Sequence, residues 1–116
     1  MVYEEIHGKY WESVHRGAVH RGLPFEITIE HAWELFLKQG RKCALSGVPI
    51  QFATTWSKKE RGEASASLDR IDSTQGYVTG NVQWLHKDVN RMKQAFPEDK
   101  FIEYCQLIAK EKGGCN

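Results

Sequence analysis

The sequence predicts a single α+β domain, because segments with helical spacing flank a central segment in which apolar residues alternate. The chain has 116 residues, which is enough for one domain with a modest core and too short for two independent ones. Hydrophobic residues make up 41% and charged residues 27%, as in ordinary folded proteins. We therefore expect one domain over residues 1–116, with a helical extension at 1–40, a core at 41–96, and a C-terminal helix and tail at 97–116.

Two amphipathic helices are predicted in the N-terminal extension. The first covers residues 4–21, where apolar side chains recur near helical spacing, and Gly22 is expected to end it. Thr28 is expected to cap a second helix, which carries apolar residues on one face through Gln39 and is closed by Gly40. Both helices should bury one face against the rest of the domain.

The central segment is predicted to hold two strands that follow each other closely. Residues 41–50 have the composition of a tight turn between two extended pieces, and residues 53–64 are polar enough for a surface loop. Alternation then predicts a strand at 66–72, a loop at 73–80 and a second strand at 81–86.

A helix beginning near Asp88 is predicted directly after the second strand, and Pro97 should stop or offset it. A last helix is expected over residues 98–112. Its inward face should comprise Phe101, Ile102, Cys105, Ile108 and Ala109. The rest of the core is expected from Trp33, Phe36, Leu45, Leu68, Ile71, Val82, Trp84 and Met92.

Composition limits the possible partners and compartments. The net charge of +1 gives no global attraction to nucleic acid, so any such contact must come from local basic clusters. No apolar run approaches the length of a membrane span, and the N-terminus does not have the pattern of a secretory signal, so we expect a cytoplasmic protein. Cys43, Cys105 and Cys115 form neither a CxxC pair nor a disulfide framework.

Two oxygen-bearing side chains are expected to meet in the central segment. Asp69 lies on the first predicted strand and Asn90 on the helix after the second. Carboxylate and amide oxygens are hard ligands that suit Mg²⁺ or Mn²⁺, with waters and a phosphate oxygen completing the shell. The two residues are therefore candidate ligands of a divalent metal ion.

Residues 66–93, with the sequence ASLDRIDSTQGYVTGNVQWLHKDVNRMK, resemble the HNH endonuclease family, especially its phage-type and small bacterial members. The upstream segment KCALSGVPI, residues 42–50, is similar to the turn that leads into the family's motif. Together they cover about half of the chain. The resemblance implies a ββα-metal (His-Me finger) core with flanking helices at both ends.

The resemblance also implies roles for individual residues. Asp69 would be the metal-binding carboxylate, and Asn90 would take the last position of the signature as second ligand. Asn81 would occupy the middle position, where its side chain ties the loop to the backbone. Arg70 stands where most of the family has a His that acts as general base. A guanidinium stays charged and cannot take that role, but it can contact the scissile phosphate.

The general base must then come from elsewhere. His86, at the end of the second strand, is the nearest candidate in the sequence, because an ordinary imidazole titrates near neutral pH. In zinc-containing relatives its position holds a structural Cys, so His86 could instead have a packing role. Asp72 acting through a water molecule and hydroxide from solvent remain open. Cys43 and His86 alone cannot complete a tetrahedral zinc site, so no structural zinc is expected.

The first functional hypothesis is a metal-dependent endonuclease that nicks or cuts double-stranded DNA. The second is a catalytically impaired, nuclease-derived DNA-binding module, and a third is a protein-interaction domain with no nucleic-acid partner. Cutting both strands would most simply require a homodimer. Trp56 is a possible contact to DNA bases. Phosphate contacts are expected from Arg16, Arg21, Lys87, Arg91 and Lys93.

Overall fold

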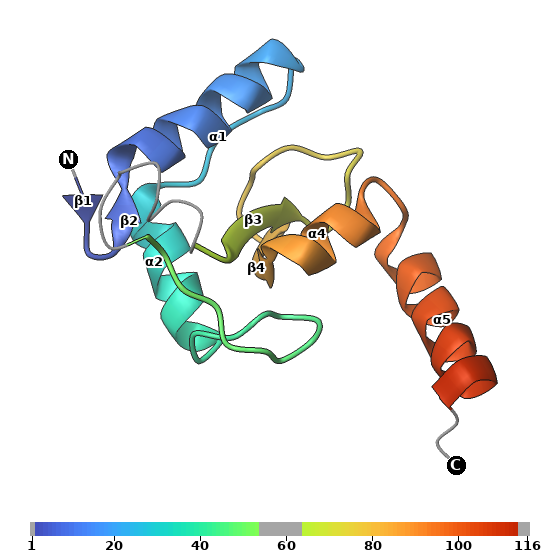
Figure 1. Cartoon of the computed structure of the whole chain (residues 1–116). Helices are drawn as coiled ribbons and strands as arrows, with labels where there is room; N and C mark the ends of the chain where they lie inside the picture. The colour runs from blue at the N-terminus through green and yellow to red at the C-terminus, as the bar shows by residue number, and fades with distance from the viewer. Residues whose placement is uncertain (1, 54–63, 114–116) are drawn as a thin grey trace.

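The computed structural model describes residues 2–53 and 64–113 of the chain. These residues form two short antiparallel sheets and four α-helices, joined by turns and loops (Figure 1). The α+β class predicted from the sequence is therefore confirmed. The expected contact by Trp56 and most of the expected loop at 53–64 lie outside the described residues.

The chain begins with a small hairpin that the sequence did not predict. Strands β1 (Val2–Tyr3) and β2 (Ile6–His7) pair antiparallel, and Glu4 takes a left-handed φ of 53° in the turn. Helix α1 then covers Gly8–His20. The expected helix start near residue 4 was wrong, because the hairpin carries the side chain of Ile6 into the core, where it is fully buried.

Helix α2 (Ile29–Lys38) has the ends that the sequence predicts. Thr28 Oγ1 accepts a hydrogen bond from the His31 backbone N–H at 3.1 Å, which satisfies a free donor of the first turn. Gly40 follows the helix with a φ of 70°, a conformation that glycine adopts without strain.

The turn around Cys43 connects α2 to the central sheet. Lys42 and Pro49 form an isolated antiparallel bridge, and Gly47 takes a φ of 76° between them. This arrangement agrees with the predicted tight turn between two extended pieces.

Strands β3 (Ala66–Arg70) and β4 (Val82–His86) form the central antiparallel pair. Leu68 pairs with Trp84 on one face, and Asp69 pairs with Gln83 on the other. Trp84 is fully buried and donates its indole N–H to the Ala32 carbonyl of α2 at 2.8 Å. One face of the sheet therefore packs on the helical extension.

The core is an aromatic cluster between α2 and this sheet. The rings of Phe36, Phe52 and Trp84 lie 4.7–6.1 Å apart, centre to centre, at tilted or edge-on angles. Most of the predicted core is buried here, whereas Leu45 and Ile71 are half-buried. The expectation for Met92 was wrong, since it is 61% exposed.

The other face of the sheet is covered by α4 (Lys87–Lys93). Helix α5 (Glu98–Ile108) follows after Pro97 and continues as a π-helical turn at Ala109–Gly113. The expected inward face of α5 was wrong, because no residue of this helix is buried. Figure 1 shows the reason: α5 projects away from the body of the domain.

Candidate functional site

A hollow of about 180 Å³ lies where β3, the β3–β4 loop and α4 meet. Its wall includes Asp69, Arg70 and Asn90, three residues that the sequence places in a candidate site. Asp69 reaches it from β3 and Asn90 from α4, so side chains 21 positions apart line one space. The remaining wall residues are Leu68, Ser73, Tyr77, Gln94 and Ala95.

Asp69 is buried, with 6% of its surface exposed, and one of its oxygens is already occupied. Oδ2 accepts hydrogen bonds from the Lys93 ammonium at 2.7 Å and from the Gln83 amide at 3.0 Å. Oδ1 accepts no hydrogen bond from the described residues. Every fully buried side-chain oxygen or nitrogen in the described part of the chain has a hydrogen-bond partner, so an oxygen without one is not fully buried. Oδ1 is therefore open to solvent and can serve as a ligand.

Lys93 is the main residue that the sequence interpretation misplaced. It was expected on the surface as a phosphate contact, but it is 1% exposed and not accessible to DNA. Its ammonium also donates to the Arg70 and Ile71 carbonyls at 3.1 and 3.4 Å, and it lies 3.6 Å from Glu98 Oε1. Helical spacing could have indicated this burial. Lys93 lies four positions after Val89, and residues with that spacing share one side of a helix, here the side of α4 that faces the sheet.

Asn90 is held by one hydrogen bond. Its Nδ2 donates to Ser67 Oγ of β3 at 2.8 Å. Since the amide nitrogen is engaged, the carbonyl oxygen is the group left to accept a hydrogen bond or to bind a cation. The hollow thus has two oxygen atoms that can bind a cation, one from each predicted ligand.

Arg70 is fixed at the edge of the hollow. Its Nη1 donates to the carbonyls of Ser73 and Gln75, the latter at 2.9 Å, and its guanidinium lies 5.6 Å from the centre of the Tyr77 ring. A cation held in one orientation by the loop contributes fixed positive charge to the wall. This charge favours an anionic ligand such as a phosphate.

Asn81 stabilises the loop that holds Arg70. Its Oδ1 accepts from the Asp72 N–H at 2.9 Å, and its Nδ2 donates to the Asp72 and Gly76 carbonyls at 3.1 and 2.9 Å. The side chain is buried and does not line the hollow. Its contacts are those of a residue that shapes the site from behind.

The structure does not bring His86 to the hollow. Strand alternation places Gln83 and Leu85 on the face of Asp69, and His86 on the opposite face. His86 Nδ1 accepts a hydrogen bond from the Asp88 N–H at 3.1 Å and so caps α4. Helix α4 therefore begins at Lys87, one residue before the start that the sequence predicts.

Asp72 is also outside the hollow. Hydrogen bonds from the Thr74 hydroxyl and backbone N–H lower the pKa of its carboxyl below the usual value. A carboxylate stabilised in this way is a weaker base. Among the described residues, therefore, no histidine and no second carboxylate lines the hollow beside Asp69.

The other predicted phosphate contacts have different environments. Arg16 is exposed on α1, and Arg21 donates to the Tyr77 hydroxyl at 3.2 Å, which brings a cation of the helical extension close to the site loop. Lys87 is half-buried at the start of α4. Arg91 is exposed, with Nη1 3.8 Å from Asp88.

Cys43 is buried in its turn, and its Sγ accepts from the Ser46 N–H at 3.4 Å. Burial acts to raise the pKa of this thiol, but hydrogen bonds from Ser46 and nearby backbone groups outweigh it, so that the pKa is lowered. Within the described ranges, no group of three or more His, Cys, Asp or Glu side chains is placed to hold a metal ion. Any ion at the hollow would therefore have few protein ligands.

Comparisons of the chain with protein-family models, curated proteins and solved structures found no match. Over residues 2–53 and 64–113, none of the helices has the length and apolar character needed to cross a membrane.

Proposed function

We propose that the chain is a metal-dependent DNA endonuclease of the HNH type, in which β3, β4 and α4 form a ββα-metal core. One observation carries the proposal: Asp69 from β3 and Asn90 from α4 line the same hollow, with Arg70 at its edge. The sequence resemblance assigns the metal to the first two of these residues. Their meeting in space is what such an assignment requires.

The donor set fits a small divalent ion that keeps most of its waters. Mg²⁺ is commonly bound through one or two protein oxygens plus water and substrate phosphate, and Asp69 and Asn90 would supply these two oxygens. When bound, such an ion polarises a phosphodiester and stabilises the departing oxygen. The Lys93 ammonium, 2.7 Å from Asp69 Oδ2, reduces the negative charge available to the ion, so we expect weak metal binding without DNA.

Within this proposal the chain's own residues bind and orient the phosphate. Arg70 is fixed by the loop and donates to phosphate oxygens, while Asn81 keeps the loop in the required shape. Arg21 and Arg91 extend the positive charge along the DNA backbone. With no histidine in the described wall, the attacking water loses its proton to solvent hydroxide, and cleavage should accelerate as the pH rises.

A second candidate function is a DNA-binding module derived from a nuclease. Two observations favour it: Lys93 already pairs with Asp69, the carboxylate that would bind the metal, and His86 caps a helix instead of facing the hollow. Such a module would retain salt-dependent binding to DNA but lack turnover.

The test is incubation of supercoiled plasmid with the purified chain and Mg²⁺ or Mn²⁺ over a range of pH, beside a DNA-binding measurement at several salt concentrations. The endonuclease proposal predicts nicking that Asp69→Asn and Asn90→Ala abolish. Glu30→Ala, which removes an exposed carboxylate from α2, is the matched control and should cleave normally. Circular dichroism checks that each variant is folded.

The outcomes separate the two candidates. Asp69-dependent nicking supports the endonuclease and rules out the inactive module. Binding without cleavage in any metal supports the module and overturns the endonuclease. A folded wild-type chain that neither binds nor cuts plasmid, linear or branched DNA contradicts both.

A further inference from the structure

Asn90 can bind a cation in only one of the two orientations of its side-chain amide. The oxygen and nitrogen ends of this group have nearly the same shape, but only the oxygen end can be a ligand. A neighbour must therefore distinguish the two ends. Among the described residues, Ser67 is that neighbour, because Asn90 Nδ2 donates to Ser67 Oγ at 2.8 Å.

Ser67 reaches Asn90 from β3, two positions before Asp69. Residues with this spacing point to the same face of a strand, so Ser67 lies on the face of the sheet that α4 covers. A hydroxyl both donates and accepts hydrogen bonds. If the Ser67 proton were free to turn toward Asn90, the hydroxyl could donate to the amide oxygen and would no longer select the nitrogen end.

Tyr10 of α1 accepts the proton of the Ser67 hydroxyl. Its own hydroxyl lies at the edge of β3 away from β4, where the oxygen accepts from the Leu68 N–H at 3.0 Å. Burial raises the pKa of Tyr10, whereas hydrogen bonds from the Leu68 N–H and the Ser67 side chain act in the opposite direction, as donors to a phenol oxygen do. The Ser67 hydroxyl thus donates to Tyr10, and its lone pairs are left to accept from Asn90.

We propose that Ser67 is a positioning residue of the metal site, which turns the Asn90 amide oxygen into the hollow, and that Tyr10 directs the Ser67 hydroxyl. The inference rests on the proposed function, in which Asn90 is a metal ligand. Neither Ser67 nor Tyr10 lines the hollow, so both act through Asn90. Tyr10 also lies outside the segments that resemble the nuclease family, so the helical extension contributes to the site.

The first experiment uses nuclear magnetic resonance of the full chain without metal. The Asn90 amide protons should show a strong Overhauser effect to the β-protons at position 67. Ser67→Ala should weaken this effect, because the amide then populates both orientations, whereas Ser67→Thr keeps the hydroxyl and should retain it. Room for the added methyl exists, since Ser67 borders a cavity of about 230 Å³ beside Tyr10. Ser13→Ala, at an exposed serine of α1, is the matched control and should change nothing.

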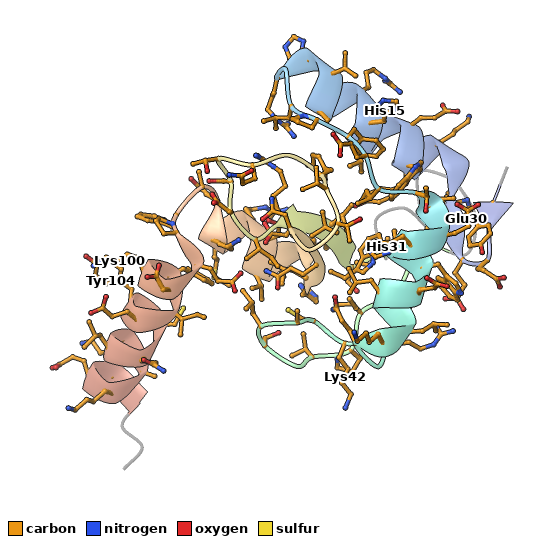
Figure 2. The ribbon with its side chains drawn as sticks, turned by 180° about the vertical axis from the view of Figure 1, so that it is seen from behind. His15, Glu30, His31, Lys42, Lys100 and Tyr104 are labelled. Atoms are coloured by element: carbon orange, nitrogen blue, oxygen red, sulfur yellow. The ribbon has the colours of Figure 1, made fainter. Side chains whose placement is uncertain are left out.

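The second experiment titrates the chain with Mn²⁺ alone and follows the paramagnetic broadening of the Arg70 backbone amide signal. Ser67→Ala should weaken Mn²⁺ binding about tenfold, as the loss of a group that orients a metal ligand typically does. Tyr10→Phe should weaken it about threefold, because one hydrogen bond behind Ser67 is lost. The control is Tyr104→Phe, at a tyrosine of α5 that is 53% exposed and points away from the rest of the chain (Figure 2). Circular dichroism checks that each variant is folded.

The outcomes separate this inference from the proposed function. Loss of the Overhauser effect and of Mn²⁺ affinity in Ser67→Ala, with both retained in Ser67→Thr, supports the role of Ser67. If Ser67→Ala leaves either one unchanged, the inference is overturned while the proposed function stands. If Tyr10→Phe behaves as Tyr104→Phe does, the role of Tyr10 is overturned. A wild-type chain that orients Asn90 as described but binds no Mn²⁺ overturns the proposed function, and the metal role of Ser67 with it.

Discussion

Replacing Lys93 with Met is the sharpest test of how the site is held together. The ammonium is buried and contacts Asp69, Glu98 and two backbone carbonyls. Removing one partner of a buried ion pair costs about 3–5 kcal/mol, because the other charge is left uncompensated. Here Asp69 keeps the Gln83 amide and has an oxygen open to solvent, so we expect a loss of about 2–4 kcal/mol.

The measurement is urea denaturation, with the free energy of unfolding extrapolated to water. A loss of 1 kcal/mol corresponds to a fall of roughly 4 °C in Tm for a domain of this size, so Lys93→Met should melt at least roughly 8 °C lower. Lys38→Met, which removes an exposed lysine at the end of α2, is the matched control and should change stability by less than about 0.5 kcal/mol.

The double variant Lys93→Met with Asp69→Leu tests the cause of the loss. When both charges of a buried pair are replaced by apolar groups, the cost is often small. The double variant should therefore be more stable than Lys93→Met alone. If Lys93→Met unfolds at the same urea concentration as Lys38→Met, or if the double variant is no more stable than the single one, the ammonium does not balance Asp69 and the reasoning fails.

Three further predictions concern the elements around the site. Burial raises the pKa of Tyr10 to about 12, so the folded chain holds the phenol proton more tightly than the unfolded chain does. The free energy of unfolding should therefore fall by about 2–3 kcal/mol between pH 10 and pH 12. Urea denaturation across that range should show a smaller fall for Tyr10→Phe, and equal falls would contradict the assignment. Asn81→Ala should destabilise the chain by about 2–4 kcal/mol in the same assay, because the substitution removes three hydrogen bonds at a buried position. A change below about 1 kcal/mol would show that the β3–β4 loop does not depend on the Asn81 side chain. Gly76→Ala should cost about 1–3 kcal/mol, since a Cβ would lie 2.5 Å from the Pro24 carbonyl oxygen, and an unchanged Tm would show that these segments separate easily.

Local signals in the sequence predicted the middle of the fold well. The Thr28 cap and the glycine at position 40 mark the bounds of α2, because each satisfies a backbone requirement that few other residues satisfy. The alternation that predicts the strand at 66–72 also implies that Leu68 and Asp69 lie on opposite faces, since a strand has only two. These features depend on neighbouring residues alone.

What the sequence did not predict depends on contacts between distant segments. Helical spacing placed apolar residues along α5, but it cannot say whether another element of the same chain covers them. Lys93 was assigned to the surface because lysine is usually exposed, yet Asp69 and Glu98, 24 and 5 positions away, compensate its charge. Burial of an ion pair requires both partners, and their meeting is decided by the packing of α4 on the sheet.

The buried network also connects the hollow to helix α5. Gln83 donates to Asp69 at 3.0 Å and to Glu98 at 2.6 Å, so one amide links the hollow to the first turn of α5. Lys93 lies between the same two carboxylates. Because Glu98 is held by this network, the start of α5 has a defined position relative to the hollow.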